Sequence, residues 1–231
     1  MLVRNDTYRR QAPRSGKEPG DASTTAALKA SEMASRLDCN PVLETIEASG
    51  ANIIGIGSDS PEAGAERFAR TLAAIYSGIT AKSYFVDARN FPVAADEAGA
   101  GTVPPALDLL HTSARADGGY LEANLAEAAG DRPITSRQIH ASLQELVQDG
   151  GCAFVLLPPV SEDENRANQS YLAAGAACDS VFLVVLTGVA TKSETKYSVH
   201  VSRLAGIKLG GIVLNDRNHF ARRLLRVASQ F

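Results

Sequence analysis

The sequence predicts an α/β fold, in which a doubly wound, mainly parallel sheet is flanked by helices. Continuous apolar runs at residues 152–157 and 181–186 are typical of strands buried on both faces of a sheet. Segments with helical periodicity separate these runs, and strands that alternate with helices form parallel sheets. The chain has 231 residues with 45% hydrophobic content, which is enough for one full core.

The chain divides into a short arm and one domain. Residues 1–21 are polar and basic, and prolines and glycines interrupt them, so no core can form there. We therefore expect residues 1–21 to be a mobile basic arm. Residues 22–231 are expected to form a single α/β domain.

The first elements follow from local patterns. Residues 22–37 are rich in alanine and predict a helix, and a shorter helix is expected from Asn40 to Ile46. Residues 52–57 predict the first buried strand. The next helix is expected to open at Ser60 and Pro61, because serine caps free amides and proline suits the first helical position.

A second strand is predicted at residues 82–86, and it ends in Asp87. An acid at the carboxyl end of a parallel strand lies at the edge where ligands bind. Residues 92–119 have too weak a periodicity to predict an element. Residues 120–125 predict a short strand.

The rest of the chain continues the alternation. Ile139, Leu143 and Val147 share one helical face, Thr135 or Ser136 is the expected cap, and two glycines end this helix. The elements expected after it are a strand at 152–157, a helix at 165–178, a strand at 181–186, a helix at 191–204, a strand at 209–214 and a basic amphipathic helix at 219–227.

The loop after the first strand has the position of a phosphate-binding loop. A loop of the G-x-x-x-x-G-K-[ST] kind offers backbone amides and a lysine to phosphates, and a hydroxyl to Mg²⁺. Here Gly64 is followed by Ala65 and Glu66, so the shape of such a loop is expected without its chemistry. The positions of this degenerate loop are Ser58, Asp59, Ser60, Glu62, Gly64, Ala65 and Glu66.

The order of these motifs resembles the bacterial tyrosine kinases (BY-kinases) of exopolysaccharide synthesis and, more broadly, the deviant-Walker P-loop ATPases that include the Min proteins. The resemblance covers about residues 52–216. It rests on IIGIGSDSPEAGAERFARTLAA, YFVDARNFP, AFVLLPPV, VFLVVLTGVATKSE and LGGIVLND, in that order. It implies a P-loop NTPase-like fold.

The departures from this family concern its catalytic residues. Glu62, Ala65 and Glu66 stand where the family has Gly, Lys and Ser or Thr, Leu156 replaces the Walker B Asp, and Arg89 replaces the second acid of the next motif. No tyrosine cluster follows at the C-terminus. A carboxylate about 4 Å from a phosphate costs about 4 kcal/mol at an effective dielectric of about 20, or about a thousandfold in affinity.

The resemblance leaves Asp87 and Asn215 as residual ligand contacts, because Asp87 is retained and Asn215 resembles the family residue near the nucleotide base. Arg89 is an alternative partner for Asp87. We expect no cofactor, and at most weak binding of ATP·Mg²⁺.

The predicted function is therefore that of a non-catalytic cytoplasmic adaptor or regulator in exopolysaccharide biosynthesis or export. The resemblance implies a membrane polysaccharide co-polymerase as the partner, together with self-association. Arg222, Arg223 and Arg226 are the expected partner-binding residues, and the contact with the inner membrane face is indirect.

Two other functions stay open at this point. One is an atypical ATP-binding kinase or ATPase that uses backbone amides and Asp87. The other is a Rossmann-like enzyme that binds a dinucleotide or methyl donor, because Gly55 and Gly57 follow a strand. Ser60 replaces the third glycine of that fingerprint, and 27 residues separate Ser60 from Asp87, against about 20 in the fingerprint.

Composition excludes several other classes. The net charge of -3 and the pI of 5.8 argue against a nucleic-acid binder. Cys39, Cys152 and Cys178 lie far apart, which predicts core thiols rather than disulfides or a zinc site, and the histidines have no metal spacing. No apolar run approaches the length of a membrane span, so we expect a soluble cytoplasmic protein.

Overall fold

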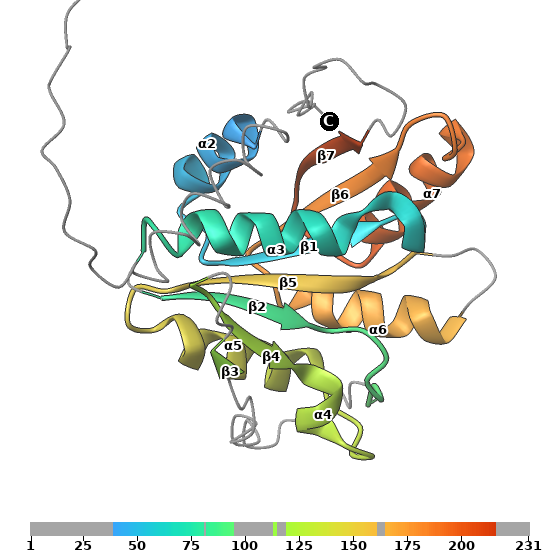
Figure 1. Ribbon diagram of the computed structural model, residues 1–231. Coiled ribbons are helices and arrows are strands. Elements are labelled where there is room, and N and C mark those ends of the chain that lie inside the picture. Colours follow the sequence, from blue (N-terminus) through green and yellow to red (C-terminus); the bar gives the residue numbers. More distant parts are fainter. Residues whose placement is uncertain (1–38, 81, 95–112, 115–118, 161–164, 216–231) are drawn as a thin grey trace, which may run out of the picture.

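The computed structural model describes residues 39–80, 82–94, 113–114, 119–160 and 165–215, which share one sheet with helices on both faces (Figure 1). Within these residues the sheet has seven strands. In spatial order they are β3 (Ser113–Ala114), β4 (Leu121–Asn124), β2 (Ser83–Asp87), β5 (Cys152–Pro159), β1 (Ile53–Ser58), β6 (Ser180–Leu186) and β7 (Leu209–Asn215). β3 runs antiparallel to β4, and the other pairings are parallel. The predicted α/β fold is confirmed.

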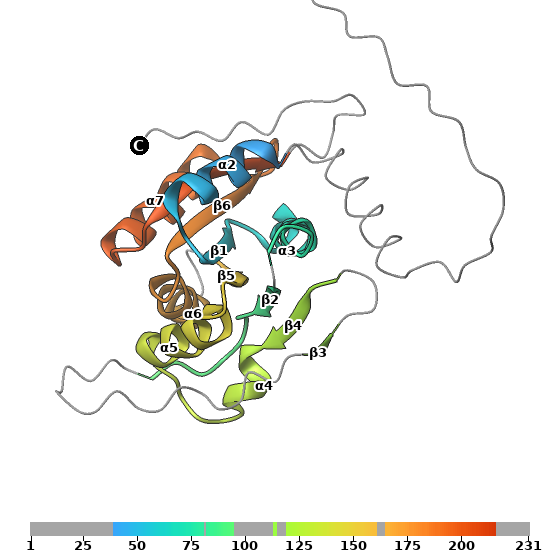
Figure 2. The same ribbon diagram turned by 90° about the vertical axis from the view of Figure 1, so that its left-hand side faces the viewer.

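The helices form a layer on each face of the sheet (Figure 2). The helical elements are α2 (Asn40–Ser49), the 3₁₀ turn η1 (Pro61–Ala63), α3 (Ala65–Tyr76), α4 (Leu125–Ala129), α5 (Ser136–Val147), α6 (Asn165–Ala176) and α7 (Lys192–Leu204). α2 and α3 share one hydrophobic cluster with the sheet, and α5, α6 and α7 pack into the other. Strand β1 contributes side chains to both clusters, because successive side chains of a strand point to opposite faces of the sheet. Ile53 packs in the cluster with α5 and α6, whereas Ile54 and Ile56 pack in the cluster with α3.

Local signals placed most of these elements correctly. Thr135 and Gln138 form the capping box that starts α5, and Pro41 lies in the first turn of α2. The short strand expected near residue 121 is β4. The three cysteines are buried free thiols, as predicted for core residues.

The expected start of the helix after β1 was wrong. Ser60 is extended and its side chain caps nothing, and Pro61 opens only the 3₁₀ turn η1. Gly64 then adopts a left-handed conformation with φ 84°, which ends the turn before α3 begins at Ala65. The segment between β1 and α3 is therefore a loop that contains a 3₁₀ turn and a left-handed glycine, and it is not the first turn of an α-helix.

Several predictions lie outside the described residues. These are the basic arm at 1–21, the helix at 22–37 and the basic helix at 219–227 with Arg222, Arg223 and Arg226. Among the helices that the structure describes, none has both the length and the apolar character needed to span a bilayer.

Candidate functional site

The candidate site lies at the carboxyl ends of β1 and β5, which are neighbouring parallel strands. The helix after β1 covers one face of the sheet and the helix after β5 covers the other. Such a reversal opens a crevice at the strand ends, where ligands of α/β proteins bind. The amide of Val160 donates to the carbonyl of Ser58 at 2.9 Å and ties the two strand ends together. The predicted loop is therefore at the ligand-binding edge of the fold.

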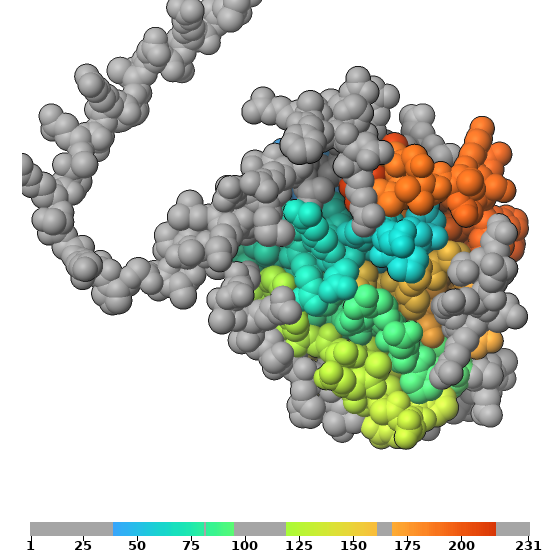
Figure 3. Space-filling view, turned by 45° about the vertical axis from the view of Figure 1, so that its right-hand side comes forward, coloured from blue at the N-terminus to red at the C-terminus, as the bar shows by residue number. Residues whose placement is uncertain are grey.

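The loop after β1 is held in place by Gly64 and Asn215. A Cβ on Gly64 would lie 2.9 Å from Nδ2 of Asn215, and the φ of 84° is strained for any other residue. Nδ2 of Asn215, at the end of β7, donates to the carbonyl of Ala63 at 2.7 Å. Asn215 was expected near a nucleotide base, and in this structure its amide fastens the loop. Figure 3 shows this loop, in cyan, between α7 in orange and the green residues that follow β2.

Asp59 is the most perturbed acid of the loop. Its two carboxylate oxygens and the hydroxyl of Ser60 are buried, and no other described residue hydrogen-bonds to them. Burial, and secondarily the charge of Glu194 at the start of α7, raises the pKa of Asp59 to about 6, while its own backbone amide partly opposes this rise. The loop therefore presents a carboxyl group with a raised pKa directly after the carboxyl end of β1.

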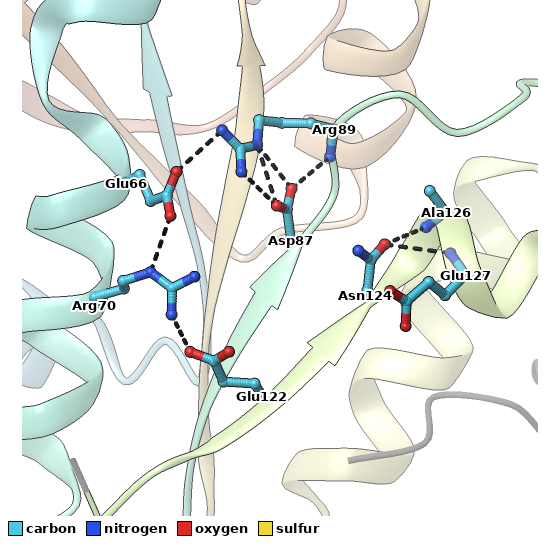
Figure 4. Close-up of polar contacts among 8 residues, drawn as sticks. All are labelled: Glu66, Arg70, Asp87, Arg89, Glu122, Asn124, Ala126 and Glu127. Atoms are coloured by element: carbon cyan, nitrogen blue, oxygen red, sulfur yellow. Dashed lines mark hydrogen bonds and ion pairs between the residues drawn. The ribbon is translucent and has the colours of Figure 1, made fainter. Parts of the chain in front are cut away.

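Five charged residues form a continuous chain beside the loop (Figure 4). We call it the ion-pair chain, and in order it comprises Asp87, Arg89, Glu66, Arg70 and Glu122. One oxygen of Glu66 accepts from Nε of Arg70 at 3.0 Å, and the other lies 3.1 Å from Nη1 of Arg89. The carboxylate of Glu66 is thus held between two guanidinium groups.

The turn after β2 positions Arg89. Oδ1 of Asp87 accepts from the amide of Arg89 at 3.0 Å, and Asn90 adopts a left-handed φ of 62°. Arg89 then folds back, so that its Nε lies 2.9 Å from Oδ1 and its Nη2 2.5 Å from Oδ2 of Asp87. This hydrogen bonding to Asp87 outweighs burial and raises the pKa of Arg89. The predicted pairing of Arg89 with Asp87 is confirmed.

Arg70 is anchored by different groups. Its guanidinium carbon lies 4.0 Å above the ring of Phe85, and its Nη1 contacts the hydroxyl of Tyr120 at 3.4 Å and pairs with Glu122. Burial alone would lower the pKa of Arg70, but hydrogen bonds to Tyr120 and Glu66 reverse this and raise it. Arg70, Tyr120 and Glu122 were missed from the sequence, although the four-residue spacing of Glu66 and Arg70 is typical of a helical ion pair.

The remaining predicted positions are either buried in the core or exposed at the surface. Ala65 is buried against the core, and the side chain of Leu156 is buried in the cluster beneath α3. Glu62 is exposed on η1, as are His140 and His200 on their helices. In the part of the chain that the structure describes, no group of three or more His, Cys, Asp or Glu residues is arranged to hold a metal ion. The position where the resemblance implied a Walker B acid therefore holds a buried leucine side chain.

Comparison with known proteins identifies the fold. No protein-family model and no curated protein sequence matches this chain. The kinase domain of Escherichia coli tyrosine kinase ETK superposes with a TM-score of 0.52 at 20% identity, over 75% of this chain and 71% of that one. The BceF tyrosine kinase domain superposes with a TM-score of 0.52 at 17% identity, over 74% of this chain and 72% of that one. The cell division ATPase MinD of Pyrococcus furiosus superposes with a TM-score of 0.51 at 15% identity, over 77% of each chain.

These structures confirm the predicted fold, since BY-kinase domains and MinD are both deviant-Walker P-loop proteins. At such identities the likeness shows the fold alone. The activity of this chain has to be argued from its own residues.

Proposed function

We propose that this chain is a non-catalytic protein on a BY-kinase-like fold, which acts as a cytoplasmic adaptor or regulator in exopolysaccharide biosynthesis or export. Its partner is the cytoplasmic segment of a membrane polysaccharide co-polymerase. The observation that carries the proposal is the placement of Glu66. This residue puts a carboxylate held by Arg70 and Arg89 where a phosphate loop needs a hydroxyl.

Three separate losses support the absence of phosphoryl transfer. Such transfer depends on positioned cations that neutralise the charge of the phosphates. Ala65 supplies no lysine, Leu156 supplies no acid for Mg²⁺, and the guanidinium of Arg89 is already engaged by Asp87 and Glu66. A phosphate that entered the loop would meet the carboxylates of Asp59 and Glu66, and the neighbouring guanidiniums of Arg70 and Arg89 are already paired with carboxylates of the chain.

The adaptor role rests on the interaction surfaces that a fold can keep after it loses its catalytic residues. Function resides in sites carried by a fold, and interaction surfaces do not depend on a phosphate loop. The resemblance to BY-kinases supplies the class of partner, and the basic C-terminal residues supply charge for an acidic partner or an anionic membrane face.

Calorimetry tests the absence of nucleotide binding. Titration of the full chain with ATP·Mg²⁺ should give no saturable heat. The triple variant Glu62→Gly, Ala65→Lys, Glu66→Ser should bind measurably, because Gly64 and Asn215 hold the loop in shape. The single variant Glu62→Gly is the matched control and should remain silent. A micromolar dissociation constant for the wild-type chain would instead support an atypical kinase or ATPase.

Co-purification tests the adaptor role. Affinity capture of the full chain from solubilised membranes should recover a polysaccharide co-polymerase, and less of it after Arg222, Arg223 and Arg226 are changed to Gln. The control changes three exposed arginines elsewhere, Arg67, Arg132 and Arg137, to Gln and should not reduce recovery. Recovery of free soluble protein alone, with normal polysaccharide output in a deletion strain, would remove the proposal.

A further inference from the structure

We propose that Arg70 and Arg89 form an anion site that Glu66 fills from within the chain, and that a phosphate ion binds there once this carboxylate is removed. The inference goes beyond the adaptor role, because it assigns a ligand class to residues that the role does not use. It rests on the contacts, other than those with Glu66, that hold the two guanidinium groups in place.

Arg89 is fixed independently of Glu66. Its Nε and Nη2 are engaged by both oxygens of Asp87, and the amide of Arg89 closes the turn onto the same carboxylate. Nη1 is the group directed at Glu66. A guanidinium is planar and its donors form a rigid fork, so two bonds to Asp87 fix the direction of the third group.

Arg70 is fixed from its other side. Phe85 lies under its guanidinium, while Tyr120 and Glu122 engage its Nη1. Nε then points to the nearer oxygen of Glu66 at 3.0 Å. Each arginine therefore keeps anchors that do not involve Glu66, and their inward donors converge on one anion.

The position between these donors is accessible to a free ion. The side chain of Glu66 is 42% exposed, and those of Arg70 and Arg89 are 23% and 37% exposed. Paired guanidinium donors match phosphate as well as carboxylate. In the wild-type chain a tethered carboxylate competes at a high effective concentration. Its removal also changes the formal charge of the ion-pair chain. With Glu66 the ion-pair chain has three carboxylates and two guanidiniums, a charge of -1, and without Glu66 it has two of each, a charge of 0.

The experiment titrates full-length Glu66→Ala with inorganic phosphate by calorimetry, against a chloride titration of the same ionic strength. We expect Glu66→Ala to bind phosphate about tenfold more tightly than the wild type, because in the wild type a tethered anion must first be displaced. Glu62→Ala removes the exposed acid of the same loop and should behave as the wild type does. Adding Arg89→Gln to Glu66→Ala should abolish the gain.

Two results would overturn the inference. One is a folded Glu66→Ala variant that binds phosphate no better than the wild type, and the other is an equal gain in Glu66→Ala with Arg89→Gln. If Glu66→Ala does not fold, Glu66→Gln replaces it, because the amide keeps the shape of the side chain and removes the charge. Its failure to gain phosphate affinity would equally contradict the proposal. These results concern phosphate alone, so they are read separately from the ATP and co-purification tests.

Discussion

Asp59 destabilises the fold locally, because its carboxylate is buried. Its oxygens are buried without a partner from another described residue, and a buried unpartnered carboxylate disfavours its charged form. Burial raises its pKa from 3.8 to about 6, and the like charge of Glu194 on α7 adds to this rise. Stability should therefore depend on pH at this residue.

The direction of that dependence follows from proton binding. Between about pH 4 and pH 6 the unfolded chain loses the Asp59 proton while the folded chain retains it, so the free energy of unfolding falls as the pH rises through this window. A rise of the pKa from 3.8 to about 6 corresponds to about 3 kcal/mol for a fully buried group, and partial solvent screening reduces this to about 1 kcal/mol.

Asp59→Asn should thus gain about 1 kcal/mol over the wild type between pH 4 and pH 6, and the gain should stay constant above pH 6. Urea unfolding of both proteins at several pH values measures it. Asp131→Asn, at an exposed position, controls for the loss of one negative charge. A difference between Asp59→Asn and the wild type that does not change with pH would contradict the burial argument.

At the scale of elements, strand β1 explains glycines that the sequence left ambiguous. Gly55 and Gly57 suggested a phosphate or dinucleotide fingerprint. In the structure, a Cβ on Gly55 would lie 2.8 Å from Cγ2 of Val181, and one on Gly57 would lie 2.9 Å from Cε2 of Tyr171. These glycines make room for side chains of α6 and β6 on one face of the sheet.

Gly57→Ala should destabilise the chain by about 1–3 kcal/mol, which is typical of overpacking. Tyr171 is fully buried and its hydroxyl is hydrogen-bonded to Oγ of Ser202 at 2.7 Å, so the ring cannot easily move aside. Gly78→Ala is the control, since its Cβ would meet only the carbonyl of Ile75 at 3.5 Å. Chemical denaturation compares the three proteins, and equal midpoints for wild type and Gly57→Ala would refute this account.

The helices and strands also show which structural features could be predicted from the sequence and which could not. Strands β5, β6 and β7 were predictable because continuous apolar runs identify buried parallel strands. The pairing of Asp87 with Arg89 was predictable because the two residues are close in sequence. The pairing of Arg70 with Glu122 was not, because 52 residues separate them. It needs both the packing of Arg70 of α3 over Phe85 of β2 and the pairing of Phe85 with Glu122 of β4. The start of α3 was missed because the loop before it is held from far away in sequence, by the bond from Nδ2 of Asn215 to the carbonyl of Ala63, and Gly64 then adopts a left-handed conformation.

At the scale of the whole molecule, the strand order separates the candidate ligand classes. In the dinucleotide-binding order 3-2-1-4-5-6, the first and second strands are neighbours, and the acid after the second strand reaches the ribose. Here β5 lies between β1 and β2 and pairs with both. Asp87 is therefore one strand further from the loop after β1, and Arg89 already holds it.

This topology predicts that NAD and S-adenosylmethionine leave the melting temperature of the full chain unchanged, and the altered loop predicts the same for ATP·Mg²⁺. A ligand at a hundred times its dissociation constant stabilises the folded state by about 2.7 kcal/mol, which a thermal unfolding scan detects easily. The triple variant Glu62→Gly, Ala65→Lys, Glu66→Ser is the positive control for ATP, because it restores a cation and a hydroxyl to a loop that Gly64 and Asn215 keep in shape. A saturable shift of the wild-type chain with NAD would mean that the crevice between β1 and β5 accepts a dinucleotide despite the inserted strand. A shift with ATP·Mg²⁺ alone would mean that the backbone amides of the loop bind phosphates even beside Asp59 and Glu66.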